Sequence, residues 1–328
     1  MKNFFLLSTL ILSLPSLTAG EESVSRIVFA SCCHESKPAP IFQTIIDFKP
    51  ELFVWMGDNI YGDSPDVDVL RKKYAIQKNR PEYQTLMAKC PIIGTWDDHD
   101  FGANDVGEKY PSKEQSQQAY LDFFNEPANS PRRTQKGIYT HKDYGTGKKS
   151  VRVFLLDTRY FRQDPGPQAD ILGADQWNWL EKNLLDSPAA VNIIVSSIQV
   201  IPEEHRFEKW ANFPTSRERL FKLLANPKCP PVVLCSGDRH LAEISQLPST
   251  TSGYPLFEIT SSAINRSGGG NPKEINRHRQ GAVFTSSNFG SFVIDWEKSP
   301  VTITASVHDQ TGQPVRTAVI SVAPRKSS

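Results

Sequence analysis

The sequence has almost no net charge. Lys and Arg total 37 and Asp and Glu total 36 among 328 residues, a formal net charge of +1. Without a bulk field to attract nucleic acid or anionic lipid, any ligand must be recognised at a local site. Internal repeats and low-complexity tracts are also lacking, which excludes fibrous and solenoid architectures. With 38% hydrophobic and 22% charged residues, the chain can bury one large core or two smaller ones.

Long apolar runs are scarce as well, and the only one lies at the N-terminus. It extends from Phe4 to Leu14 and is followed by small residues up to Gly20. Such a run of about 11 residues is too short to cross a bilayer, which takes roughly 20. We therefore expect a signal peptide over residues 1–20, cleaved after Ala19 or Gly20, and an exported (periplasmic or secreted) protein without a transmembrane span. The alternative is an uncleaved anchor.

Cysteine is also rare, with five in the chain. An odd number leaves at least one thiol outside any disulfide in an exported protein. Cys32 and Cys33 do not easily bridge to each other, because adjacent Cα atoms lie about 3.8 Å apart with diverging side chains. One of the two is therefore a candidate for another role. Disulfide pairing among the remaining thiols stays open for Cys33, Cys90, Cys229 and Cys235.

Short apolar runs alternate with longer amphipathic stretches, the pattern of a layered α/β fold. We expect strands at residues 27–31, 52–56, 92–96, 151–156, 192–197 and 232–236. We expect helices at residues 40–48, 67–89, 112–125, 174–185 and 215–225. Ser112 and Gln115 form a capping-box pattern that marks the start of the third helix.

After Glu258 the pattern changes to strands without a helix of any length. We expect strands at residues 256–261, 281–286, 291–295, 301–307 and 316–322. Alternating polar and apolar residues over 302–307 indicate a half-exposed antiparallel strand. About 70 residues are few for a separate β-sandwich, so we expect these strands to extend the main sheet.

Polar, ligand-rich peptides follow four of the expected strands. They are Ser31 to His34, Gly57 to Asp63, Asp97 to Asp100, and Gly237 to His240. Because ligands bind at strand ends on one edge of an α/β sheet, we expect these side chains to lie close together. Carboxylate, imidazole, thiolate and phenol suit a transition metal beside a hard cation. Each peptide alone is more often an ordinary turn, but four in one order favour a metal site.

The order of these peptides resembles the calcineurin-like metallophosphoesterases, and more closely their alkaline phosphatase D (PhoD-like) branch. Gly57-Asp58 matches the second motif of the superfamily, Asp98 replaces the Asn of the third, and Asp238 replaces the first His of the fourth. Asp157-Thr158-Arg159 also looks like that branch. The resemblance implies an α/β fold, a layered αββα metallophosphoesterase sandwich in which additional C-terminal β-strands complete the second sheet, over residues 21–328.

The resemblance implies a metal centre that holds Fe³⁺ and Ca²⁺. It assigns as metal ligands Cys32, Asp58, Tyr61, Asp98, Asp238 and His240. Asp58 would bridge the two ions, while Cys32 and Tyr61 offer the thiolate and phenolate expected of ferric iron. Asp98 and Asp238 would hold calcium. The alternatives are a turn for Asp58, a core residue or disulfide partner for Cys32, and aromatic packing for Tyr61.

His99 and Arg159 are the expected catalytic residues. His99 matches the superfamily histidine that contacts phosphate and protonates the leaving group, and its Asp neighbours favour the charged form. Arg159 offers a planar fork for two phosphate oxygens, with an ordinary surface ion pair as the alternative. Asp97 would support the metal ligands or bind directly. Gln199 is either a further polar contact or a structural amide. We expect structural or solvated roles for His34, His205 and His278.

These assignments predict a metal-dependent phosphoric ester hydrolase, acting on a small-molecule or lipid phosphate ester through a metal-activated water. The sequence does not separate phosphomonoesterase from phosphodiesterase activity. Alternatives are a phospholipid-directed phosphodiesterase of the same family and a degenerate, non-catalytic phosphate- or calcium-binding module. We expect no nucleic-acid binding, since the basic cluster at residues 277–279 is small. We also expect the N-terminal β-domain and twin-arginine signal of larger members to be absent.

Overall fold

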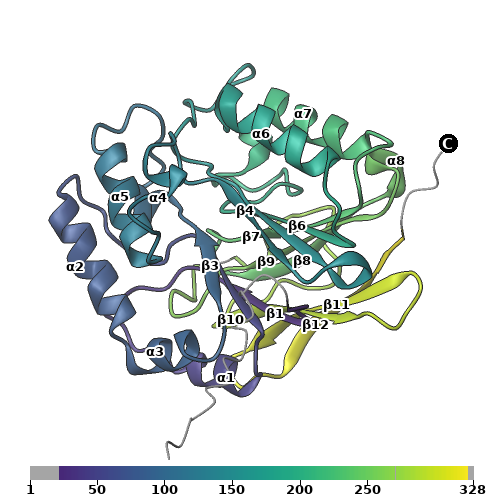
Figure 1. Cartoon of the computed structure of the whole chain (residues 1–328), viewed down its shortest axis with the longest axis horizontal. Helices are drawn as coiled ribbons and strands as arrows, with labels where there is room; N and C mark the ends of the chain where they lie inside the picture. The colour runs from purple at the N-terminus through teal and green to yellow at the C-terminus, as the bar shows by residue number, and fades with distance from the viewer. Residues whose placement is uncertain (1–21, 270, 324–328) are drawn as a thin grey trace, which may run out of the picture.

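Two six-stranded sheets form the centre of the molecule in the computed structural model, which describes residues 22–269 and 271–323 (Figure 1). The first has the order β12-β11-β10-β1-β2-β3 and the second the order β4-β5-β6-β7-β9-β8. The first comprises β1 (Arg26–Ala30), β2 (Leu52–Met56), β3 (Ile92–Thr95), β10 (Asn288–Asp295), β11 (Val301–Asp309) and β12 (Pro314–Val322). The second comprises β4 (Thr140–Tyr144), β5 (Val151–Leu155), β6 (Val191–Ser196), β7 (Val232–Ser236), β8 (Ala242–Leu247) and β9 (Leu256–Ser261).

Helices cover the outer face of the second sheet and that of β1, β2 and β3 in the first sheet (Figure 1). Beside the first sheet lie α1 (Ile41–Asp47), α2 (Val67–Lys78), α3 (Pro81–Met87), α4 (Asp98–Phe101) and α5 (Lys113–Phe123). Beside the second lie α6 (Gly173–Leu185), α7 (Pro214–Ala225) and the short α8 (Ser249–Ser252). Single 3₁₀ turns occur at Pro131–Arg133, Gly147–Lys149 and Trp210–Asn212. In the described part of the chain, no helix is long and apolar enough to cross a membrane.

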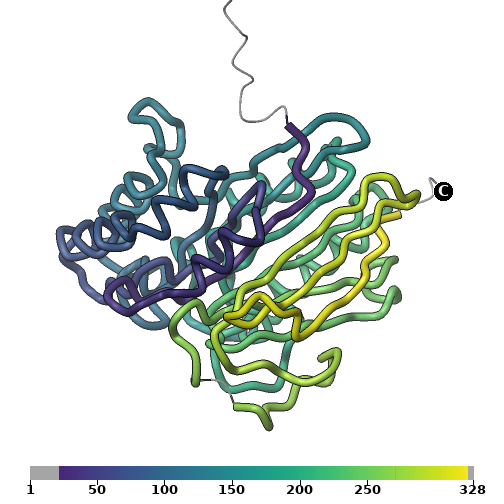
Figure 2. Tube along the Cα trace, turned by 90° about the horizontal axis from the view of Figure 1, so that it is seen from below, coloured from purple at the N-terminus to yellow at the C-terminus, as the bar shows by residue number. Residues whose placement is uncertain are grey.

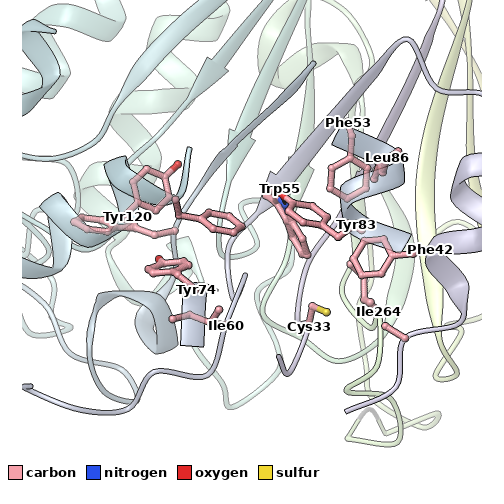
Figure 3. Close-up of a cluster of buried hydrophobic side chains, with 14 of the residues drawn as sticks. Cys33, Phe42, Phe53, Trp55, Ile60, Tyr74, Tyr83, Leu86, Tyr120 and Ile264 are labelled. Atoms are coloured by element: carbon pink, nitrogen blue, oxygen red, sulfur yellow. Dashed lines mark hydrogen bonds between the residues drawn. The ribbon is translucent and has the colours of Figure 1, made fainter. Parts of the chain in front are cut away.

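The alternation of side chains along each strand separates three hydrophobic cores. In β2, Phe53 and Trp55 point to the helices, whereas Leu52, Val54 and Met56 pack between the sheets. Figure 3 shows the first of these groups, with Trp55 against Phe53 and Tyr83. Strands buried on both faces read as continuous apolar runs, which is why the sequence located them. The layered αββα architecture is therefore confirmed.

The C-terminal strands correct one detail of the expectation. β10, β11 and β12 do not complete the second sheet; they extend the first, because β10 pairs antiparallel with β1. Figure 2 shows that the early and the late segments of the chain lie side by side. Of the expected C-terminal strands, β9 joins the second sheet, parallel to β7, and β8 completes that sheet at its edge. Pairing with β10 covers the edge that β1 would otherwise leave open.

Two further elements differ from the expectation. The helix expected over residues 67–89 is broken into α2 and α3, because Pro81 begins α3 and places Arg80 in an extended conformation. The strand expected at 281–286 is absent from the described residues, where Phe284 forms only an isolated bridge to Ala242. The sequence also missed β4, whose residues are mostly polar, and β8, which follows the fourth motif directly. The expected signal peptide lies outside the described residues.

Candidate metal centre and active site

The four ligand-rich peptides converge in space, as expected for strand ends of parallel strands. They follow β1, β2, β3 and β7, and two glycines allow their close approach. A Cβ on Gly57 would lie 2.6 Å from the Asp97 Cβ, and one on Gly237 would lie 2.6 Å from the Ser31 Oγ. Both distances are shorter than real Cβ contacts, so a larger residue would push the turns apart. Glycine at these two positions of the Gly-Asp motifs therefore allows the turns to pack closely.

Backbone strain is concentrated at the same turns. The φ angles of Cys32, Asp58, Asp238 and His240 are 59°, 50°, 70° and 52°. Residues other than glycine seldom adopt this left-handed backbone conformation, and each such residue costs on the order of 1–3 kcal/mol of conformational free energy. Four of them at the ends of three strands indicate that the fold maintains this geometry for a function.

Asp58 occupies the centre of the cluster. Its Oδ2 lies 3.3 Å from the Cys32 Sγ and 3.1 Å from the Tyr61 hydroxyl, which is itself 2.9 Å from the His240 Nε2. Its Oδ1 is buried, and no hydrogen-bond partner for it exists within residues 22–269 and 271–323. A buried carboxylate oxygen left without a donor is a place for a cation. The Cys32 thiol is buried and is in no disulfide, so the disulfide alternative does not apply.

Three ligand groups satisfy the spacing that a metal ion requires. Their ligand atoms lie within 4.8 Å of one another in the sets Cys32-Asp58-His240, Asp58-Asp98-His99 and Asp97-Asp98-Asp238. Because Asp58 and Asp98 each belong to two sets, the sets adjoin one another. The structure thus brings together all six residues expected as metal ligands, with Tyr61 attached through Asp58 and His240.

Electrostatic repulsion within this cluster is severe without cations. Burial, and then Asp98 and Asp97, raise the pKa of Asp58 well above its ordinary value. Burial, and then Asp97, likewise raise the pKa of Asp238. Burial raises the pKa of Asp97 to about 7, although Arg159 opposes the shift. Several buried carboxylates that resist ionisation are stabilised by bound cations, so the donor set and its charge fit a metal centre.

Asp98 is the exception among these carboxylates. Burial opposes its ionisation, but Arg159 and His99 outweigh it and hold the pKa of Asp98 below its ordinary value. Its oxygens also accept the backbone N–H groups of His99 at 2.9 Å and Asp105 at 2.8 Å. Asp98 is therefore an anionic carboxylate already oriented by the first turn of α4.

His99 forms a pair with Asp63, a residue that the sequence analysis did not select. The His99 Nδ1 lies 2.6 Å from the Asp63 Oδ1, which leaves Nε2 as the ring nitrogen available to a substrate. Burial lowers the pKa of His99, but the Asp63 hydrogen bond and nearby Asp98 outweigh it and raise that pKa. The sequence signal for this contact was that Asp63 belongs to the ligand-rich peptide after β2. In the structure the Gly62 N–H donates to the His99 carbonyl at 2.9 Å, which holds that peptide beside His99.

Arg159 departs from the substrate-binding role expected for it. Its side chain has no exposed surface, and its Nε donates to the Asp97 Oδ1 at 2.6 Å. The other side of the guanidinium is held by Glu208, which also pairs with Arg162. Arg159 is not among the residues that line the cavity described below, and its contacts form a buried ion-pair network, not the surface ion pair that was the alternative.

A cavity of about 430 Å³ opens onto the cluster. It is lined by three of the expected ligands, Asp58, Asp238 and His240, and by the expected acid His99. Its other polar and apolar lining includes Asn104, Asp105, Arg162, Arg206, Phe207, Glu208, Asn212 and Arg239. Gln199 is not among them, because its Nε2 donates to Glu243 and Thr260 at 2.7 and 2.8 Å. Gln199 is thus a structural amide.

A further residue that sequence reasoning missed is Ser262, which follows β9. Its hydroxyl lies 3.1 Å from the Cys32 Sγ and accepts the His240 N–H at 3.0 Å. His34, expected to be structural, stacks on the Tyr61 ring with centroids 5.5 Å apart. Both residues fix ligand side chains from outside the cluster. A lone serine after a strand carries no sequence signal for such a role.

With this geometry established, comparison with known proteins identifies the family. A family model described as PhoD-like phosphatase matches residues 65–305, well over half of the chain. The chain belongs to the PhoD-like phosphatase family. The resemblance read from the strand-end motifs is therefore confirmed, and the matched residues include the third and fourth motifs together with β8 and β9.

Individual relatives agree with this membership. Alkaline phosphatase D of Bacillus subtilis (strain 168) is 25% identical over 290 residues, covering 72% of this chain and 48% of the relative. This PhoD-like chain thus spans about half the length of that curated relative. A solved structure of PhoD superposes with a TM-score of 0.69 at 21% identity, covering 94% of this chain and 74% of its own.

More distant structures share the fold alone. A dimetal phosphatase from Danio rerio has a TM-score of 0.57 at 12% identity, covering 92% of this chain and 100% of its own. GAP50, described as the anchor in the inner membrane complex of Plasmodium, has a TM-score of 0.62 at 14% identity, covering 93% and 91%. A fold shared by a phosphatase and an anchor protein does not by itself establish catalysis. The argument for function must rest on the site.

Proposed function

We propose that this protein is a metal-dependent phosphoric ester hydrolase. The observation that carries the proposal is the position of Asp58, shared by two adjoining ligand sets in a cavity that His99 also lines. A bridging carboxylate beside an imidazole of raised pKa is the arrangement that hydrolysis of a phosphate ester requires. Both phosphomonoesters and phosphodiesters fit the proposal, and residues 21–328 are proposed to act as one domain.

The metals proposed are Fe³⁺ and Ca²⁺. Cys32, Asp58, Tyr61 and His240 would hold iron, because thiolate and phenolate favour a ferric ion, and Asp58, Asp98 and Asp238 would hold calcium, which prefers oxygen ligands. When bound, the two ions supply an activated water nucleophile and neutralise the charge of the phosphoryl oxygens. Asp97 faces the calcium ligands and is held in place by Arg159.

The side chains of this chain have separate tasks in the reaction. His99 donates a proton from Nε2 to the leaving-group oxygen, and Asp63 holds the opposite nitrogen so that the ring keeps this orientation. Arg159 is a positioning residue that fixes Asp97 and the cavity-lining Glu208. Burial of the cluster strengthens each of these interactions, because solvent screens them little.

We also propose that the protein is exported, on the strength of the leader over residues 1–20. Calcium is plentiful outside the cytoplasm, which agrees with an oxygen-rich site. N-terminal sequencing of the mature protein, purified from the extracellular or periplasmic fraction, tests this proposal. A mature chain that still begins at Met1 would contradict it.

The experiment that tests the function is metal removal followed by controlled reloading. Chelated protein should hydrolyse neither 4-nitrophenyl phosphate nor bis(4-nitrophenyl) phosphate, and Fe³⁺ with Ca²⁺ should restore activity and give a visible charge-transfer colour. A colourless, fully active zinc protein would refute the iron assignment. Protein that binds the metals stoichiometrically without hydrolysing any ester, including phosphatidylcholine in vesicles, would show the non-catalytic alternative.

A further inference from the structure

The cavity lining contains one arginine that has no ion-pair partner among the described residues. Arg162 pairs with Glu208, and Arg239 pairs with Glu274 through both carboxylate oxygens at 2.7 and 2.9 Å. Arg206 also lines the cavity and is exposed, but none of the described residues supplies a carboxylate partner for it. An unpaired guanidinium at a cavity wall is available to an anion of a ligand.

An exposed aromatic ring accompanies this arginine. Phe207 is 41% exposed and lines the same cavity. The Arg206 guanidinium carbon lies 5.1 Å from the ring centroid, and that of Arg239 lies 4.3 Å from it. Contact with two cations orients the ring, while its exposed part keeps apolar area open to the cavity. A large apolar side chain left open at a polar cavity is typical of a ligand contact.

The turn that carries Arg206 and Phe207 is anchored from below. Lys209, which is only 6% exposed, donates to the Phe207 carbonyl at 3.1 Å and to the Asn212 Oδ1 at 2.8 Å. Glu208 is buried and held by Arg159 and Arg162. The two residues of the turn that face the cavity are therefore presented on a fixed backbone. A preorganised turn loses little conformational entropy on binding a ligand.

We propose that Arg206 and Phe207 form a subsite for the organic part of the substrate. The subsite selects phosphate esters whose alcohol portion combines an apolar ring, which Phe207 contacts, with a second anionic group, which Arg206 pairs with. This inference rests on the proposed hydrolase function, because it places the reacting phosphate at the proposed metal cluster, whose residues line the same cavity. Arginine suits the task, since its fork matches carboxylate and phosphate oxygens.

A pair of non-hydrolysable ligands tests the subsite by binding alone. Metal-loaded protein should bind 4-carboxybenzylphosphonate roughly 3- to 10-fold more tightly than 4-carbamoylbenzylphosphonate, which has the same shape without the charge. Calorimetry should show this preference vanish in Arg206→Gln, persist in part in Arg206→Lys, and shrink at 1 M salt. Equal affinities in the parent protein, or a preference that survives in Arg206→Gln, would overturn the subsite.

A matched control separates the local effect from a general change of surface charge. Arg219 is also exposed and lies 4.6 Å from the Trp177 ring, but it belongs to α7 away from the cavity. Arg219→Gln should leave the carboxylate preference unchanged. Phe207→Ala should weaken both phosphonates by the same factor, because the ring contacts the part that they share. A loss of preference in Arg219→Gln would count against the subsite.

Turnover of the corresponding phenyl phosphates distinguishes this inference from the proposed function. The kcat/KM ratio of 4-carboxyphenyl to 4-carbamoylphenyl phosphate should exceed 1 in the parent protein and fall to about 1 in Arg206→Gln. Hydrolysis of both esters with equal kcat/KM in the parent would overturn the subsite and leave the hydrolase proposal intact. Binding preference without any turnover would refute the hydrolase proposal and leave the subsite supported.

Discussion

At the residue scale, the site shows how burial and a neighbouring charge give similar groups different states. Asp58 and Asp98 lie in the same cluster, yet the pKa of the first is raised and that of the second is lowered. The difference comes from Arg159, His99 and two backbone N–H groups, all of which act on Asp98. Roles at this site are therefore decided by contacts, not by residue type.

Replacing His99 by Ala should remove the general acid while the metals stay bound. The rate on esters with a poor leaving group should fall roughly 10²- to 10⁴-fold, and the loss should shrink for 4-nitrophenyl esters, whose leaving group needs no proton. Metal analysis and kinetics on both kinds of ester check this. Loss of metal in the variant would instead make His99 a ligand, and equal losses on both esters would exclude the acid role.

Asp63→Asn should move the alkaline limb of the pH–rate profile to lower pH. The raised pKa of His99 keeps the imidazole protonated to higher pH, and the hydrogen bond to Asp63 is the main cause that raises it. Removing that charge lowers the pKa, so the acid form is lost earlier as pH rises. A profile of kcat/KM against pH measures the shift. Asp186→Asn, at an exposed position after α6, should not move the profile.

Arg159→Met should destabilise the fold more than it weakens substrate binding. The change leaves Asp97 and Glu208 buried without their shared partner, which costs about 3–5 kcal/mol. Urea denaturation measures the free energy of unfolding, and Arg159→Lys should restore part of it. If Arg159 bound phosphate directly, the KM would rise while the unfolding midpoint hardly changed.

At the scale of elements, the site depends on how closely strand-end turns pack. β1, β2 and β7 belong to two different sheets, and Gly237 brings their turns together. A Cβ at this position would meet the Ser31 Oγ at 2.6 Å and the Met56 carbonyl at 2.7 Å. Asp58 and Asp238, the proposed metal ligands, are each one or two residues from these contacts. Element packing therefore controls ligand spacing.

Gly237→Ala should lower metal affinity and cost about 1–3 kcal/mol of unfolding free energy, because the added methyl group forces the turns apart. Gly166→Ala is the matched control, since nothing lies within 4 Å of a Cβ built there. Metal titration and denaturation of the two variants provide the comparison. Unchanged metal affinity in Gly237→Ala would show that the cluster tolerates a wider gap between the sheets.

At the scale of the whole molecule, buried acids link metal binding to pH. Burial raises the pKa of Asp97, Asp100 and Glu258 to about 7 in each case. The folded metal-free protein therefore holds protons that the unfolded chain has released, between the ordinary carboxyl pKa near 4 and about 7. The contribution of these acids to the free energy of unfolding is greatest below pH 4, and it is lost as pH rises through 7.

The stabilisation that metals confer should grow over the same interval. At low pH the ions must displace protons from the cluster, whereas near pH 7 they relieve repulsion among ionised carboxylates. Thermal melting with and without the metals, at several values between pH 4 and pH 8, should show an increasing difference. A difference that stays constant over this range would mean that the cluster is ionised throughout and that its pKa values are not raised.

The sequence alone determined the layered α/β class, most strands, and the four motifs that follow them, because these features depend on local periodicity and on turn residues. The αββα arrangement was implied by the family resemblance that those motifs carry. Tertiary structure decided what depends on distant neighbours. Pairing of β10 with β1, burial of Arg159, and the contact between His99 and Asp63 each join segments that no local pattern connects. The free charge of Arg206 is likewise a property of its surroundings. The proposed function of this site depends on which charged side chains the fold pairs with each other and which it leaves without an ion-pair partner.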